Sequence, residues 1–159
     1  WMVAEGDEYQ AKILTLTPSV VLLTNIEYDH PDFYPTEESY YEVFRTLLRD
    51  LPAEALVVAH QDLEGFVVKE TKALTLFFSE EPELSLMLWG AHNRTNASGV
   101  LAVARALGIN EATARMTLGK FRGTKRRMEL YTDPEAARVV LDDYAHHPTE
   151  IRATLSALR

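Results

Sequence analysis

The sequence predicts an α/β fold with a mostly parallel sheet covered by helices. Short runs rich in β-branched residues alternate along the chain with longer segments whose apolar residues recur every three to four positions. The runs are too continuously apolar for strands with one face in water, so we expect strands buried on both faces. At 159 residues, 47% hydrophobic and 25% charged, the chain is long enough for an ordinary domain with a core.

The individual elements follow from local patterns. After the first apolar run, Tyr40, Phe44 and Leu47 recur at helical spacing, which predicts an amphipathic helix. Two further helices are predicted where small and apolar residues follow Asn93 and where Asn110 stands as an N-cap residue. In chain order we expect a strand at 19–26, a helix at 37–51, strands at 55–60, 73–78 and 84–89, helices at 93–107 and 110–121, and a strand at 137–143.

A change in composition separates the last long helix from the C-terminal part. The segment GKFRGTKRRMELYTDPEAARVV combines glycine, a basic cluster and a turn that contains Pro134. We therefore predict a domain boundary near Gly123, between residues 1–123 and residues 124–159. Two short strands should follow it, and then a helix with Pro148 in its first turn.

The two ends of the chain suggest a piece of a longer protein. The chain starts in an apolar segment without an initiator methionine, and the final predicted helix has no strand after it. We therefore expect both ends to be internal positions of a longer protein.

Composition argues against several classes of function. A formal net charge of −8 repels phosphate backbones, so we expect no nucleic-acid partner, although Lys125, Arg126 and Arg127 offer a local site for small anions. The chain has no cysteine for a disulfide, a thiolate metal site or a nucleophile. No apolar run approaches the roughly 18 residues that span a bilayer, and the first residues do not form a signal peptide. We expect a cytoplasmic protein without a membrane partner.

Acidic residues follow the first apolar segment. Ligands of open α/β sheets collect beyond the carboxyl ends of the strands, so the residues after each apolar run are candidates for function. Glu5, Asp7 and Glu8 follow Met2-Val3-Ala4, which we interpret as the end of a strand. A carboxylate there can bind a hard divalent cation that phosphates and water complete, or it can belong to a solvated acidic turn.

A histidine follows the next strand. His30 lies in the loop after the run at 19–26 and precedes a proline. As a neutral imidazole it can bind a metal or orient a phosphate, and the alternative is a surface loop histidine. We interpret its neighbours Glu27 and Asp29 as residues that shape the loop.

Asparagines open the helix predicted at 93–107. Asn93 and Asn96, with His92 beside them, occupy its first turns, and an asparagine amide presents both the donor and the acceptor that the edge of adenine requires. Such asparagines can instead be capping residues.

The strand predicted at 137–143 ends in ionisable residues. Asp142 and Asp143 are placed to hold ribose hydroxyls or a cation. The alternative makes Thr149 or these aspartates helix caps, and His146 and His147 surface residues. Adjacent histidines on a turn point in different directions, so His146 and His147 alone do not predict a zinc site.

Together these motifs resemble a known family. The ordered set EGDEY, TNIEYDH, GAHNRTNA, GTKRR and DDYAHHPTE resembles the Mur ligase family, ATP-dependent enzymes that add amino acids to the peptidoglycan precursor, and the resemblance covers nearly the whole chain. It is greatest to the branch that joins L-alanine to UDP-N-acetylmuramate, with the branch that recycles murein peptides next. It implies the later part of an ATP-binding central domain followed by the start of a Rossmann-like C-terminal ligase domain. It also implies a role in cell-wall biogenesis, and so in cell shape and division.

The resemblance implies a role for each motif, carried over by position. Glu5 would bind the magnesium ion between the ATP phosphates, and His30 would bind a second magnesium ion near the transferred phosphoryl group. Arg126 or Arg127 would reach the phosphates. The remaining residues would contact the nucleotide: His92, Asn93 and Asn96 at adenine, Asp143 at the ribose, and Tyr144, His146 and His147 along the closed cleft.

The chain also departs from the family. It contains no glycine-rich phosphate loop of the form G-x-x-G-K-[ST], so we expect these 159 residues alone to be inactive. The segment before the HNRTN helix is shorter than the family usually shows. Two other classes stay open: a noncatalytic nucleotide-binding remnant, and a metal-dependent hydrolase. The hydrolase would use the side chains of Glu5, Asp7, His30, Asp143 and His147.

Overall fold

The computed structural model describes residues 2–133, 135 and 137–159. The chain divides into two compact units, residues 1–79 and residues 80–159, and each is described by itself. No helix among the described residues is both long and apolar enough to cross a membrane.

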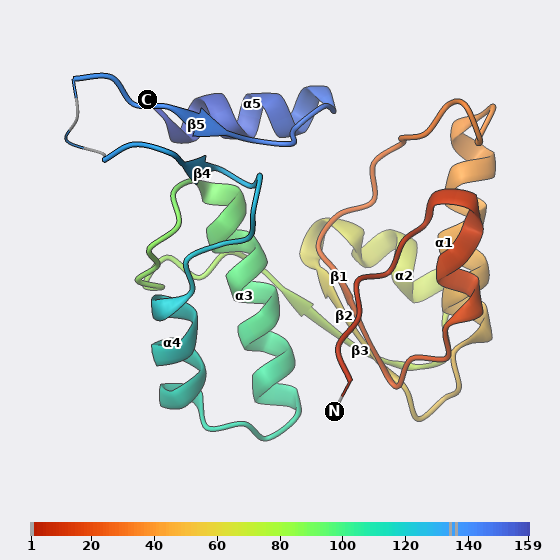
Figure 1. Ribbon diagram of the computed structural model, residues 1–159. Helices are drawn as coiled ribbons and strands as arrows, with labels where there is room; N and C mark the ends of the chain where they lie inside the picture. The colour runs from red at the N-terminus through yellow and green to blue at the C-terminus, as the bar shows by residue number, and fades with distance from the viewer. Residues whose placement is uncertain (1, 134, 136) are drawn as a thin grey trace. The chain divides into compact units, whose positions relative to one another are not determined.

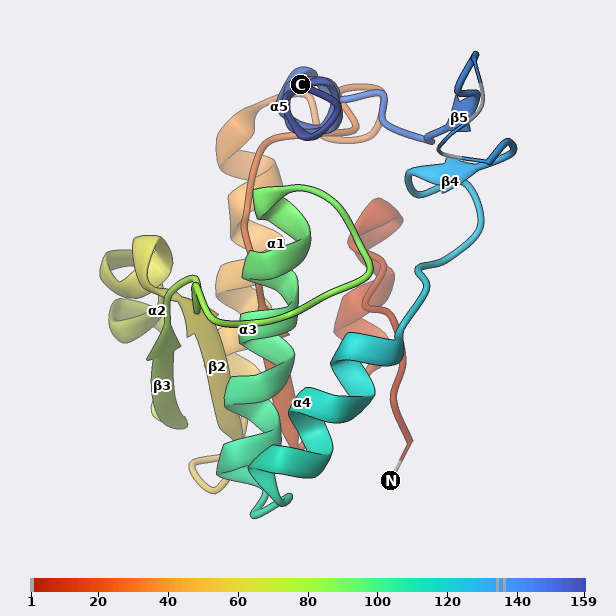
Figure 2. The same cartoon turned by 90° about the vertical axis from the view of Figure 1, so that its left-hand side faces the viewer.

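The first unit contains the parallel sheet. Strands β1 (Val20–Leu23), β2 (Leu56–His60) and β3 (Leu74–Phe78) lie side by side in the order β1-β2-β3, all parallel (Figures 1 and 2). Val57 of the central strand stands between Val21 and Thr75. These strands confirm the predicted α/β class.

Two helices connect the strands of this sheet. Helix α1 (Glu37–Asp50) leads from β1 to β2, and α2 (Glu64–Glu70), preceded by the 3-10 turn η2 (Gln61–Leu63), leads from β2 to β3. Right-handed crossovers in one direction place both helices on the same face of a sheet, as Figure 1 shows. The short helix α2 was not among the predicted elements.

Helix α1 has the apolar face predicted from the sequence and a capped N-terminus that was not predicted. Its N-terminus is a capping box, in which Thr36 Oγ1 accepts from Ser39 N at 3.2 Å and Ser39 Oγ accepts from Thr36 N at 3.3 Å. Its apolar face packs into the core of the first unit. The buried residues of that face are Tyr40, Val43, Phe44, Leu47 and Leu48.

The prediction that the strands are buried on both faces is correct for the central strand β2 and wrong for β3. Val57, Val58 and Ala59 of β2 have no exposed surface, whereas Leu74 and Leu76 of β3 are 65% and 46% exposed. β3 pairs on one side only within the described residues, and one of its faces is open. A continuous apolar run therefore does not by itself establish burial on both faces.

The strand inferred at Met2-Val3-Ala4 is also wrong. Residues 2–8 have no regular secondary structure, and Met2 and Val3 are almost fully exposed. A strand requires a partner for its backbone groups, and no described strand pairs with this segment. The segment leads into the 3-10 element η1 (Tyr9–Thr15).

Two helices dominate the second unit. Helix α3 (Ala91–Ala106) begins two residues before the predicted start, and α4 (Glu111–Lys120) matches the prediction. Asn110 is the N-cap of α4, because its Oδ1 accepts from Thr113 N at 3.0 Å.

The strand predicted at 84–89 does not form. Leu84 is buried against Ala97 and Leu101 of α3, and the segment packs on helices instead of joining a ladder. At Gly119 of α4, an added Cβ would lie 3.1 Å from the carbonyl oxygen of Ser85. The apolar run therefore did not correctly predict a strand here, because no described strand pairs with it.

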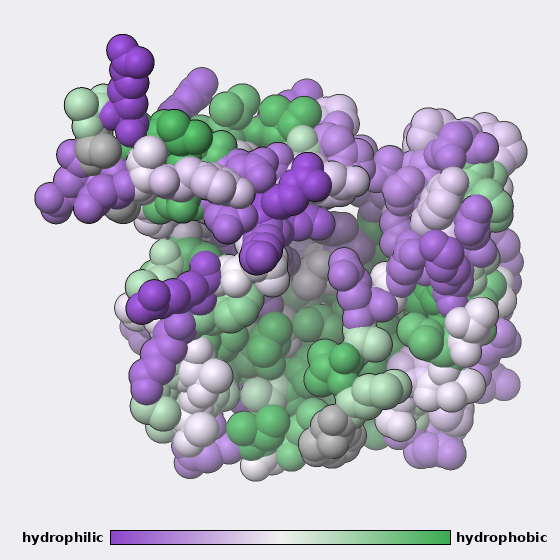
Figure 3. Space-filling view, viewed as in Figure 1, coloured by the Kyte–Doolittle hydropathy of each residue, from purple (hydrophilic) through white to green (hydrophobic). Residues whose placement is uncertain are grey.

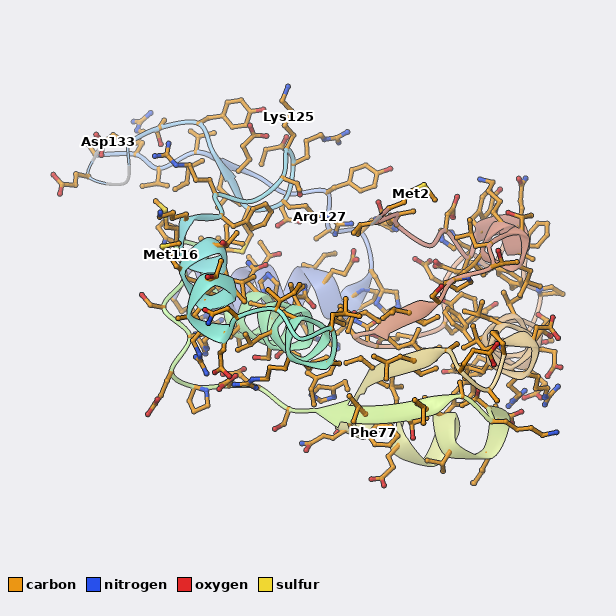
Figure 4. The ribbon with its side chains drawn as sticks, turned by 90° about the horizontal axis from the view of Figure 1, so that it is seen from below. Met2, Phe77, Met116, Lys125, Arg127 and Asp133 are labelled. Atoms are coloured by element: carbon orange, nitrogen blue, oxygen red, sulfur yellow. The ribbon has the colours of Figure 1, made fainter. Side chains whose placement is uncertain are left out.

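The C-terminal part forms a short hairpin and a helix. Strands β4 (Glu129–Leu130) and β5 (Leu141–Asp142) pair antiparallel, and helix α5 (Pro148–Ala157) begins at the predicted proline. The prediction of a buried strand over 137–143 is wrong, because only two residues pair and Val139 and Val140 are about half exposed. Figure 4 shows Asp133 at the turn of the hairpin, and the predicted turn residue Pro134 lies outside the described residues.

Candidate nucleotide and metal site

The loop after β1 holds His30 in a defined conformation. His30 has a left-handed backbone with φ of 58°, which is uncommon for a residue other than glycine. Its carbonyl oxygen accepts hydrogen bonds from Phe33 N at 3.0 Å and Tyr34 N at 2.8 Å. Asp29 Oδ1 accepts from the backbone N–H of His30 at 2.7 Å. Asp29 therefore shapes the loop as expected.

The imidazole of His30 faces acidic side chains. Its Nε2 lies 3.5 Å from Glu8 Oε1 and 4.0 Å from Asp29 Oδ2, and its ring lies 5.0 Å from the Tyr9 ring. Glu5 lies exposed in the irregular segment before η1. The carboxylate of the EGDEY motif that contacts His30 is thus that of Glu8, which was not among the residues assigned a role. No local pattern distinguishes these two glutamates.

Asp7 has a separate set of contacts. Its Oδ2 pairs with Lys12 Nζ at 2.9 Å and its Oδ1 accepts from Tyr9 N at 2.9 Å. The hydrogen bond from Lys12 holds the pKa of Asp7 below its usual value. Asp7 is therefore part of an exposed turn, which is the alternative given for this acidic segment.

A cation beside His30 would have to be held mainly by phosphate and water. Among residues 2–133, 135 and 137–159, no group of three or more His, Asp or Glu side chains could hold a metal ion alone. Mg²⁺ keeps several waters and uses one or two carboxylates together with substrate phosphates. The structure does not bring Glu5, Asp7 and His30 together as the protein-held centre that a hydrolase would need.

The start of α3 packs tightly against α5. Gly90 has φ of +94°, and an added Cβ would lie 2.6 Å from His92 Cε1 and 2.9 Å from Ala157 Cβ. His92 is partly buried, and burial lowers its pKa against the opposing effect of the Asp143 charge. The imidazole of His92 is therefore partly enclosed within this unit.

The two asparagines of α3 do not cap the helix. The N-cap residue is Gly90, and Asn93 Nδ2 donates to Trp89 O at 2.7 Å. Asn96 is exposed one turn further on. The capping alternative is therefore wrong for this pair, and Asn96 remains accessible to a ligand.

Asp143 connects three segments of the second unit. Its carboxylate accepts from Met128 N at 3.0 Å, from Ala145 N at 2.8 Å and from Thr154 Oγ1 at 3.2 Å. A carboxylate offers about four lone-pair sites, so these three contacts leave little capacity for a ribose hydroxyl. The structure shows a structural role for Asp143, and ribose contact stays a prediction.

Two arginines line the entry to β4. The guanidinium carbon of Arg126 lies 4.6 Å from the centre of the Tyr144 ring, and its Nε lies 3.7 Å from Asp142 Oδ2. Arg127 Nη1 lies 3.7 Å from Glu150 Oε1. More than half of each arginine side chain is exposed, so both can reach an anion. Figure 3 shows hydrophilic side chains gathered over this part of the unit.

The two histidines of DDYAHHPTE build the start of α5. His147 Nδ1 accepts from Thr149 N at 3.3 Å, which makes His147 the N-cap, and Glu150 Oε2 accepts from the backbone of His146 and His147. Neither Thr149 nor the aspartates cap this helix, so that part of the alternative is wrong, whereas His146 is exposed as the alternative expected. Glu150 was missed, although an acidic residue three positions after a cap is a recognisable signal.

The comparisons with known proteins identify the family of this α/β chain. Residues 2–83 match the Mur ligase middle domain, and residues 126–159 match the Mur ligase glutamate ligase domain. The chain belongs to the Mur ligase family, which consists of ATP-dependent amide ligases. The predicted boundary near Gly123 falls between the two matched ranges and stays a prediction.

The similarity extends over most of this chain. A UDP-N-acetylmuramate–L-alanine ligase from Rubrobacter xylanophilus is 38% identical over an alignment of 183 residues. The alignment covers 99% of this chain and 41% of the relative. The solved UDP-N-acetylmuramate-alanine ligase from Thermotoga maritima is 26% identical with a TM-score of 0.72, over 93% of this chain and 40% of that protein. A MurF ligase from Thermotoga maritima, solved in complex with ADP, shares the fold at 19% identity and a TM-score of 0.70, over 93% of this chain and 41% of that protein. The chain spans about two fifths of these proteins.

Proposed function

We propose that the protein carrying this chain is a cytoplasmic, ATP-dependent ligase that joins L-alanine to UDP-N-acetylmuramate in peptidoglycan precursor synthesis. The observation that supports this most is the 38% identity to an alanine-adding ligase across 99% of the chain. The loop that presents His30 at the end of β1 supports it structurally.

The reaction would proceed by transfer of the γ-phosphate of ATP to the substrate carboxylate. This gives an acyl phosphate, and the amine of L-alanine then attacks the acyl carbon and releases phosphate. Bound magnesium would neutralise charge on the phosphates. Glu5 is proposed to hold the ion between the phosphates, and His30 a second ion near the transferred phosphoryl group. Arg126 and Arg127 are proposed to stabilise the negative charge that develops on the transferred group.

Nucleotide contacts are proposed for the second unit. Asn93 and Asn96, with His92, would meet the adenine, because α3 presents the exposed amide of Asn96 at its first turns. Asp143 is proposed at the ribose. Tyr144, His146 and His147 are proposed to line the closed site.

The activity is testable in the complete gene product that carries this chain. Phosphate release should require UDP-N-acetylmuramate, L-alanine, ATP and magnesium together. The control replaces L-alanine with the free tripeptide L-alanyl-γ-D-glutamyl-meso-diaminopimelate, the amine substrate expected for the recycling branch. Release only with the tripeptide would contradict the assignment to the alanine-adding branch.

Asn96→Ala should weaken ATP binding with little effect on folding. Loss of a paired donor and acceptor to the base is expected to cost about 1–3 kcal/mol of binding, and calorimetry with ATP and with GTP measures it. The matched control is Asn110→Ala, which removes the α4 cap and should lower stability without a selective effect on ATP. Equal losses of ATP and GTP binding would contradict the adenine contact.

A further inference from the structure

Glu8 links His30 to the buried core of the first unit. Glu8 Oε1 lies 3.5 Å from His30 Nε2 and 3.3 Å from the hydroxyl of Tyr40, which donates to it. The backbone carbonyl of Glu8 also accepts from the Tyr34 hydroxyl, which in turn accepts from Ala11 N at 3.0 Å. Tyr34 and Tyr40 are each 4% exposed. Buried tyrosines therefore fix both the carboxylate and the backbone carbonyl of Glu8.

The turn that carries Glu8 is unusual. Gln10 and Ala11 have left-handed φ angles of 56° and 57°, although neither is glycine. Ala11 N donates to Glu8 O at 2.8 Å, and this reversal places Glu8 beside the His30 loop. Residues held in sparsely populated conformations persist where surrounding contacts determine them, and here the contacts to Tyr34 do so.

The hydroxyl of Tyr40 acts as a stable donor. Burial, with a further contribution from the Glu8 carboxylate, raises the pKa of Tyr40 well above its usual value. Tyr40 belongs to the packed face of α1 and makes edge contacts with the rings of Tyr28 and Tyr34. The core therefore fixes the position of the Tyr40 hydroxyl. The hydrogen bond from this hydroxyl then fixes the position of the Glu8 carboxylate.

Two carboxylates lie near one nitrogen of His30. Glu8 is 3.5 Å and Asp29 is 4.0 Å from Nε2. An ionised carboxylate only accepts hydrogen bonds, and a neutral imidazole has one N–H and one lone pair. At these distances the carboxylates act on the imidazole through their charge, and two negative charges beside Nε2 favour the proton there and the lone pair on Nδ1. Histidines that bind metals or substrates are commonly oriented in this way, with the second nitrogen donating to a carboxylate.

We propose that Glu8 is the positioning residue of His30: anchored by Tyr40, it orients the imidazole as the Nε2–H tautomer and leaves Nδ1 as the nitrogen that meets a ligand. The ligand is a phosphate-bound cation or the phosphate itself, and this part rests on the proposed function. Glu8 acts through His30 and is not assigned a contact with the reacting atoms. The orientation of the imidazole does not depend on which amino acid the protein adds.

The test is a two-bond ¹H–¹⁵N correlation spectrum of the protein labelled with ¹⁵N-histidine, at a pH where His30 is neutral. The expected result is a protonated Nε2 and an unprotonated Nδ1. Glu8→Ala should convert this to a mixture of tautomers, and Glu8→Gln, which preserves size, should lower the Nε2–H fraction even if the alanine variant folds poorly. A parent spectrum with the proton on Nδ1, or an unchanged spectrum in Glu8→Gln, would overturn the proposal.

A matched tyrosine pair tests the anchor. Tyr40→Phe keeps the ring and removes the hydroxyl that donates to Glu8, so the Nε2–H fraction should fall. Tyr41→Phe removes a hydroxyl from the neighbouring ring, which packs against Phe66, and should leave the tautomer unchanged. Equal spectra for the two variants would show that Tyr40 does not anchor Glu8.

Addition of magnesium and ATP tests the alternative that Glu8 and His30 bind one cation together. Two ligands of one cation also lie about 3 Å apart in octahedral geometry, so Glu8 Oε1 and His30 Nε2 could bind a cation jointly. A ligand-induced shift at Nδ1 with Nε2 still protonated supports positioning, and loss of the Nε2 proton overturns it. The tautomer is measured without substrate, so failure of the alanine-adding activity would leave this result intact.

Discussion

Glu5→Ala is expected to abolish turnover in the complete gene product while the fold stays intact. Glu5 is exposed in an irregular segment, and loss of a solvated carboxylate should change the free energy of unfolding by no more than about 0.5 kcal/mol. Loss of a ligand to the cation on the phosphates would remove charge stabilisation that the reaction needs. The measurement is phosphate release beside a thermal unfolding curve.

The matched control for Glu5 is Glu54→Ala. Glu54 is also exposed, but it precedes β2 and therefore lies at the amino-terminal edge of the parallel sheet, opposite to the edge from which the His30 loop leaves β1. That variant should keep the parent's activity. An active Glu5→Ala variant would place the phosphate–cation cluster elsewhere.

His30→Ala provides a graded comparison for the same cluster. It should lower activity and raise the magnesium concentration needed for half-maximal turnover, because mass action and water can partly replace one ligand. A magnesium titration of turnover measures this. An unchanged rate and magnesium dependence would make His30 a loop histidine.

Leu48→Ala should cause the largest loss of stability in the first unit. Leu48 has no exposed surface and lies on the face of α1 that packs into the core. Removal of a buried leucine side chain costs about 2–5 kcal/mol, a large part of a typical domain stability of about 5–15 kcal/mol. Urea unfolding measures the free energy change.

Leu74→Ala is the control for this prediction. Leu74 is 65% exposed on β3, so the same change of side chain should cost much less. Similar losses at the two positions would contradict the packing of α1 on the sheet. The comparison also bears on the site, because α1 carries Tyr40, which holds Glu8.

The secondary-structure positions of several candidate residues were predictable, and their contacts only in part. The sequence placed His30 after a strand and Asn93 and Asn96 at a helix start, and the structure has them there. The assignment of Arg126 to an interdomain linker stays a prediction. Figure 4 shows Lys125 and Arg127 on the loop before β4. Asp143 instead holds the segments around it together by accepting three hydrogen bonds. Residue types alone do not reveal these contacts.

The sequence by itself determined the elements whose signals are local. The α1 capping box, the Asn110 cap and Pro148 at the start of α5 each act within a few residues, so no distant partner is needed. Only the tertiary structure decided the outcome where a partner is distant. No strand among the described residues pairs with residues 84–89. Glu8 contacts His30 because a left-handed turn and two buried tyrosines bring them together. Ladder pairing and side-chain contacts between remote segments depend on the packing of the whole unit, which no short pattern encodes.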